Sequence, residues 1–174
     1  SNFSMDDSMS QIITKVIILA ILVLFSAYFS ATETAFFSLN KIRIKSLAGE
    51  GNKRAKKVSK ILDDMDALLS TILIGNNIVN IGATAIATVL FIDLVGEELG
   101  ATLSTVVLTV VVLMFGEITP KSLAKNFPEK FSMFSAPFIS FCMVLFKPIN
   151  WFVSIWQKLM YKFVKNTDER GVTE

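Results

Sequence analysis

The stretch that decides the fold is "ATLSTVVLTVVVLM", residues 101–114, which runs directly into "FGEITPK", residues 115–121. The first part carries no charge, and about 20 residues of this kind form a helix that crosses the roughly 30 Å of hydrocarbon in a bilayer. The second part then introduces a carboxylate at Glu117 and a proline at Pro120. The sequence therefore predicts a membrane-spanning helix over about 99–118, with an unusual polar end.

The composition extends this interpretation to the whole chain. Of its 174 residues, 52% are hydrophobic and only 18% are charged. A soluble domain of this length cannot bury so much apolar surface, so the lipid bilayer is its expected partner. The net charge of only +2 provides no basic surface for binding nucleic acid.

Two more apolar segments are long enough to cross a membrane. They predict a first helix over about 12–39 and a second over about 67–92, ahead of the third over 99–118. The segments must be helical because lipid cannot satisfy free backbone groups. The expected fold class is an all-α, multi-pass protein of the cell membrane with three transmembrane helices.

The connections between these helices predict the orientation. The first connection is rich in lysine and arginine, whereas the second contains acidic residues and no base. The positive-inside rule then places residues 40–66 and 121–130 in the cytoplasm, with the N-terminal segment 1–10 outside and the C-terminus cytoplasmic.

The last third of the chain holds all four prolines and predicts a Pro-kinked juxtamembrane helical region over 121–165. Residues 131–146, "FSMFSAPFISFCMVLF", are either a fourth span or a re-entrant or interfacial helix pair. The following residues alternate aromatic and basic side chains, as a helix on the cytoplasmic membrane surface does. Residues 166–174 have the composition of a linker.

Polar residues inside the first two spans suggest a common site. Ser26 and Ser30 are four residues apart in the first span, and Asn76 and Asn80 are four apart in the second. Each pair therefore shares one helical face. At 1.5 Å per residue, both pairs lie about 12–20 Å from the cytoplasmic edge, so they can face one cavity. Helix packing through small residues and asparagine hydrogen bonds is the alternative explanation.

Glu117 and Pro120 add a third group of oxygen atoms. Proline has no N–H, so the carbonyl of Gly116 loses its helical donor, and a helix end expected here carries partial negative charge. A carboxylate, a carbonyl and a helix end together outline a cation site. Alternatively, Glu117 pairs with Lys121 one turn later. Glu33, near the end of the first helix, either snorkels or pairs with a loop lysine.

Three stretches together resemble the transmembrane domain of the CNNM/CorC family of magnesium transporters. They are "FSATETAFFSLNKIRIKSLA" (29–48), "LLSTILIGNNIVNI" (68–81) and "FGEITPKSLAKN" (115–126), and the resemblance covers about residues 10–165. It implies a transmembrane domain over 11–165 that forms a homodimer. It also implies cytoplasmic CBS domains, which are missing from this chain, beyond the linker. The implied activity is Mg²⁺ export, with Na⁺ as a possible coupling ion.

The resemblance and the spacing select the same residues for the metal. Oxygen-only ligands favour Mg²⁺, Ca²⁺ or Na⁺ over Zn²⁺ or Cu⁺. A membrane scaffold for cytoplasmic regulatory domains is the alternative function. We expect no enzyme, because the chain has no histidine and no HExxH-like pair. The predicted metal site comprises Ser26, Ser30, Asn76, Asn80, Gly116 and Glu117.

Overall fold

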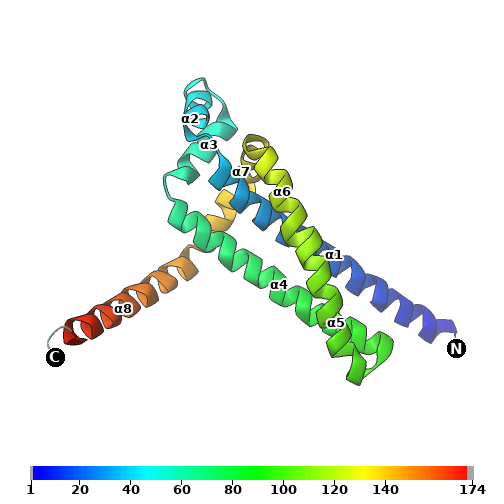
Figure 1. The fold of residues 1–174 in the computed structure, drawn as a ribbon. Coiled ribbons are helices and arrows are strands. Elements are labelled where there is room, and N and C mark those ends of the chain that lie inside the picture. The colour runs from blue at the N-terminus through cyan, green and yellow to red at the C-terminus, as the bar shows by residue number, and fades with distance from the viewer. Residues whose placement is uncertain (1, 172–174) are drawn as a thin grey trace.

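The computed structural model describes residues 2–171, and within this range every regular element is a helix. Figure 1 shows three long helical rods: α1 (Asn2–Ser38), α4 (Met65–Val95), and a composite of α5 (Glu97–Val111), η1 (Val112–Ile118) and α6 (Thr119–Asn126). All three rods are long and apolar enough to cross a membrane. The prediction of an all-α protein with three transmembrane helices is therefore confirmed.

The first two rods are longer than the sequence predicted. The first helix begins at Asn2 instead of about residue 12, so most of the segment 1–10 continues the helix. The second extends from Met65 to Val95 instead of 67–92. An established helix gains one hydrogen bond for each residue added, so polar residues can extend it beyond the hydrocarbon.

The third rod corrects the predicted helix end near residue 118. The chain stays helical through Pro120 and ends only at Asn126. In η1 the backbone N–H of Thr119 donates to the carbonyl of Met114, five residues earlier. Such a π-type turn is wider than an α-turn and is a local way to fit a residue that has no N–H. The helix terminus expected beside Glu117 is therefore absent from that position.

Two short helices occupy the basic connection, residues 40–66, for which the charges predicted only a cytoplasmic position. They are α2 (Lys41–Gly49) and α3 (Lys53–Leu62), and the side chains of Asn40 and Asn52 accept backbone N–H bonds at their N-termini. Asparagine is favoured at such caps because it pairs orphan donors. The apolar face of α3 packs against α7, so this connection is part of the folded bundle.

The C-terminal third forms α7 (Pro128–Leu145) and α8 (Lys147–Gly171), bent by 63° relative to each other. The predicted Pro-kinked region is helical, and a pair bent this strongly is either a broken span or a re-entrant element. Figure 1 shows α8 leaving the bundle as an arm, and α8 buries no residue. Of the predicted linker, residues 166–171 continue α8, and 172–174 lie outside the described residues.

A buried hydrophobic cluster joins α1, α4 and α7. Phe29 and Phe36 of α1, Ile72 of α4 and Ile139 of α7 belong to one buried cluster. Gly75 allows α4 to approach α1 closely, since a Cβ atom there would lie only 2.5 Å from the Phe29 ring. This packing fixes the rotation of α1 against α4 at the depth of the polar residues.

Candidate metal site

Three of the predicted site residues are joined by hydrogen bonds. Ser26 Oγ in α1 donates to Asn76 Oδ1 in α4 at 3.1 Å, and Asn80 Nδ2 donates to the same oxygen at 3.4 Å. Ser26 is fully buried, and both asparagines are half-buried. Ser26 of the first span therefore contacts Asn76 of the second, whereas Ser30 forms no hydrogen bond to either asparagine.

Gly116 brings the third rod to this cluster. A Cβ atom at this position would lie 3.0 Å from Ser26 Oγ and 3.5 Å from Ser26 Cβ. Glycine gives η1 room here, because an added Cβ atom would require the Ser26 side chain to shift by a few tenths of an ångström. Pro120, four residues later, has no N–H, so the Gly116 carbonyl cannot receive its usual α-helical bond. A site between three helices thus includes one backbone carbonyl that lacks its α-helical donor.

Two buried oxygen atoms of the site have no hydrogen-bond partner among the described residues. They are Ser30 Oγ, in a residue only 1% exposed, and Asn80 Oδ1. Leaving a buried polar atom unpaired costs about 1–3 kcal/mol, so such atoms are uncommon. Because Ser30 follows Ser26 by one helical turn, the serine pair and the asparagine pair each contribute one uncommitted oxygen.

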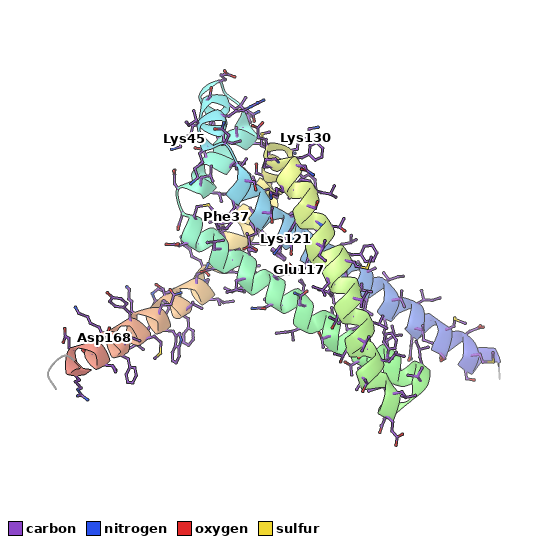
Figure 2. The ribbon with its side chains drawn as sticks, viewed as in Figure 1. Phe37, Lys45, Glu117, Lys121, Lys130 and Asp168 are labelled. Carbon is purple, nitrogen blue, oxygen red and sulfur yellow. The ribbon has the colours of Figure 1, made fainter. Side chains whose placement is uncertain are left out.

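Glu117 is held differently from the other predicted ligands. Its carboxylate forms an ion pair with Lys121 at 3.1 Å, one turn along the same rod (Figure 2). The side chain is 27% exposed. The sequence left open that Glu117 pairs with Lys121, and this ion pair is present in the structure.

Glu33 is the carboxylate whose role the sequence left undecided. It lies on α1 three residues after Ser30, on the same side of the helix, and is half-buried. Among residues 2–171 it forms no ion pair, so the suggested pairing with a loop lysine is absent. Glu33 is therefore a free carboxylate one turn from the uncommitted Ser30 oxygen. The i, i+3 spacing from Ser30 was the available sequence signal.

The ligand atoms of this cluster indicate which class of cation it can bind. Within the described residues there is no group of three or more His, Cys, Asp or Glu side chains arranged to hold a metal. The donors are instead hydroxyl, amide and carbonyl oxygens, which suit hard cations such as Mg²⁺, Ca²⁺ and Na⁺. Polar groups at membrane depth are expensive and commonly mark ion pathways.

Fold and site together define the class of protein: a helical membrane protein with an oxygen-lined centre between three spans. Residues 17–174 match the family described as the Cyclin M transmembrane N-terminal domain. The chain belongs to this family, as its resemblance to CNNM/CorC proteins predicted.

Curated relatives agree with this assignment. The chain is 46% identical over 151 residues to a "UPF0053 protein" of Haemophilus influenzae, covering 87% of this chain and 36% of the relative. It is 40% identical over 139 residues to the "UPF0053 inner membrane protein YfjD" of Escherichia coli, covering 80% and 32%. A "Polyamine export protein" of H. influenzae is 25% identical over 177 residues, covering 94% and 41%. The chain thus spans about a third of the length of the first two relatives.

Proposed function

We propose that the protein transports Mg²⁺ across the cell membrane through the site between α1, α4 and η1. The observation that carries this proposal is the pair of buried, unpartnered oxygens, Ser30 Oγ and Asn80 Oδ1, beside the Ser26–Asn76 hydrogen bond. A cation held here would replace the hydrogen bonds within the cluster by metal–oxygen contacts and would use the two uncommitted oxygens as well.

The composition of the site favours transport over permanent retention of the metal. Mg²⁺ gives up its waters reluctantly and is usually held by carboxylates. Here neutral oxygens dominate, Glu117 is already paired with Lys121, and Glu33 lies at the edge of the cluster. We expect weak binding, which allows the ion to leave the site on the far side of the membrane.

The charge pattern supports the proposed orientation, and the family supports the proposed direction of transport and assembly. Basic residues in 40–66 favour a cytoplasmic position for α2 and α3, with the N-terminus outside. We propose export, with inward Na⁺ as the coupling ion, by a homodimer that carries cytoplasmic CBS domains. No enzymatic activity is proposed.

The polyamine exporter among the relatives suggests organic cations as a second substrate class. Polyamines carry several ammonium groups, which are best held by carboxylates and aromatic faces. The central cluster instead has serine hydroxyls and asparagine amides, and Gly116 lies close to the Ser26 side chain. A small inorganic cation fits these donors better, and a spermidine arm in the flux assay distinguishes the two substrates.

The decisive experiment measures Mg²⁺ flux into or out of liposomes for the wild type and Asn80→Ala. The matched control is Asn77→Ala, because Asn77 is an exposed asparagine outside the hydrogen-bonded cluster. Transport predicts that flux is lost in Asn80→Ala and kept in Asn77→Ala. Equal flux in all three proteins would refute the site.

A membrane scaffold without transport remains the competing function, and two further variants separate it. Asn76→Ala and Glu117→Ala in a transporter lower flux while the oligomeric state stays unchanged. In a scaffold the wild type has no flux, and the same substitutions change the oligomeric state because the polar groups serve packing.

A further inference from the structure

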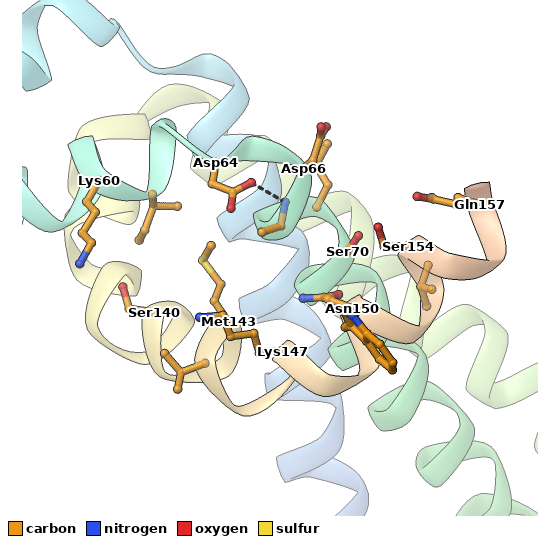
Figure 3. Close-up of a pocket in the computed structure, with 16 residues that line it drawn as sticks. Lys60, Asp64, Asp66, Ser70, Ser140, Met143, Lys147, Asn150, Ser154 and Gln157 are labelled. Atoms are coloured by element: carbon orange, nitrogen blue, oxygen red, sulfur yellow. Dashed lines mark hydrogen bonds between the residues drawn. The ribbon is translucent and has the colours of Figure 1, made fainter. Parts of the chain in front are cut away.

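A second cavity, separate from the metal site, lies at the Met65 end of α4. It has a volume of about 960 Å³, is open on one side, and is lined by the end of α3, the first turns of α4, the end of α7 and the start of α8 (Figure 3). No predicted metal ligand lines it. We call it the α4–α8 cavity.

Charged side chains of both signs line this cavity. Lys60 and Lys147 provide two positive charges, and Asp64 and Asp66 provide two negative ones. Within residues 2–171 none of the four belongs to an ion pair, although Asp64 caps α4 by accepting the Ala67 N–H. A ligand that carries one positive and one negative group would complement this lining.

The side-chain oxygen of Asn150 is a further acceptor that lacks a hydrogen-bond donor among residues 2–171. Its Nδ2 donates to Thr71 Oγ1 at 3.4 Å, while its buried Oδ1 has no partner in the described part of the chain. A primary ammonium group carries three N–H donors and can supply the missing bond. A quaternary ammonium group has no N–H and cannot.

The position of the cavity fits a lipid. Asp66 is the last charged residue before the uncharged stretch of α4, so the cavity lies level with the headgroups at one membrane surface. Leu69, Val144 and Trp151 give its wall an apolar part. Tryptophan at this level is typical of the boundary between headgroups and acyl chains.

We propose that the α4–α8 cavity binds a phospholipid with a zwitterionic headgroup that contains a primary ammonium, the phosphoethanolamine type. Its phosphate lies between Lys60 and Lys147. Its ammonium group faces Asp64, Asp66 and Asn150. The acyl chains follow the apolar wall. This site is independent of the metal site and of the proposed transport.

The chain offers a direct fluorescence test, because it has two tryptophans and only Trp151 lines the cavity. In a Trp156→Phe background reconstituted in nanodiscs, Trp151 reports the nearby lipid. We expect half-maximal quenching by acyl-brominated phosphatidylethanolamine at about a fivefold lower mole fraction than by brominated phosphatidylcholine, the ratio that about one net hydrogen bond gives.

Two substitutions and one control connect the preference to the cavity. Asp66→Asn and Asn150→Leu should bring the ratio of the two lipids close to one, since the first removes a negative charge that faces the ammonium group and the second removes a hydrogen-bond acceptor. Asn166→Leu, on the exposed surface of α8 outside the cavity, should keep the fivefold ratio. Equal quenching by the two lipids in the starting protein would overturn the proposal. So would a preference that survives in both cavity variants.

Discussion

The two serines of α1 should differ in how their substitution by alanine changes the stability of the protein. Ser26 Oγ makes a hydrogen bond to Asn76, whereas Ser30 Oγ, one turn away and equally buried, has no partner. Ser26→Ala therefore removes a bond whose net value is about 0.5–1.5 kcal/mol. Ser30→Ala removes a buried atom that costs about 1–3 kcal/mol to leave unpaired.

The expected difference in the free energy of unfolding follows from these terms. Ser26→Ala should destabilise the protein by about 1 kcal/mol. Ser30→Ala should leave its stability unchanged or raise it by about 1 kcal/mol, because the small cavity left by one oxygen offsets part of the gain. The two variants should thus differ by about 1–2 kcal/mol. Unfolding in mixed micelles, without Mg²⁺, measures this difference.

Adding Mg²⁺ tests whether Ser30 Oγ takes part in metal binding. A ligand that binds only the folded state stabilises it by an amount that grows with ligand concentration over the dissociation constant. The wild type should gain stability with Mg²⁺, and Ser30→Ala should gain less despite its better starting stability. If Ser30→Ala destabilises the protein as much as Ser26→Ala, its hydroxyl has a structural partner and the reasoning fails.

Three further substitutions test other parts of the structure. Gly116→Ala places a Cβ atom 3.0 Å from Ser26 Oγ, so that hydroxyl must rotate away; we expect a several-fold loss of Mg²⁺ flux with little loss of stability. Lys121→Met releases the Glu117 carboxylate from its ion pair; we expect Mg²⁺ affinity measured by calorimetry to rise several-fold, because the freed carboxylate then reaches the metal. Gly100→Ala places a Cβ atom 2.7 Å from backbone atoms of α4, which cannot rotate away; the thermal midpoint should fall by several degrees.

Gly82→Ala is the control for both glycine substitutions, since its added Cβ atom would meet Leu22 at an ordinary 3.7 Å. It should keep both flux and thermal midpoint. A Gly116→Ala protein with wild-type flux would show that the close approach of η1 to α1 is unimportant for transport. A Gly100→Ala protein as stable as Gly82→Ala would contradict the packing of α5 on α4. For Lys121→Met, an unchanged affinity would exclude Glu117 from the metal site.

The basic connection shows how much local structure the sequence already contained. Asn40 and Asn52 are both followed by helices, and Ala55, Val58 and Ile61 recur at the spacing of a buried helical face. These local signals are sufficient to predict α2 and α3, whereas the charges of this connection indicate only its side of the membrane. That α3 packs on α7 depends on contacts between distant segments and was not predictable from either segment alone.

The sequence by itself determined the membrane environment, the three spans and the oxygen chemistry, because hydrophobic length and residue type are local properties. It also placed Ser26 and Asn76 at a common depth, since rise per residue is fixed in a helix. Only the tertiary structure decided how the helices rotate and how closely they approach. In this arrangement Gly116 lies against Ser26, Ser30 Oγ has no hydrogen-bond partner among the described residues, and Glu117 forms an ion pair with Lys121. The physical reason is that periodicity fixes the face on which a side chain lies, whereas its partner depends on packing between helices distant in the chain.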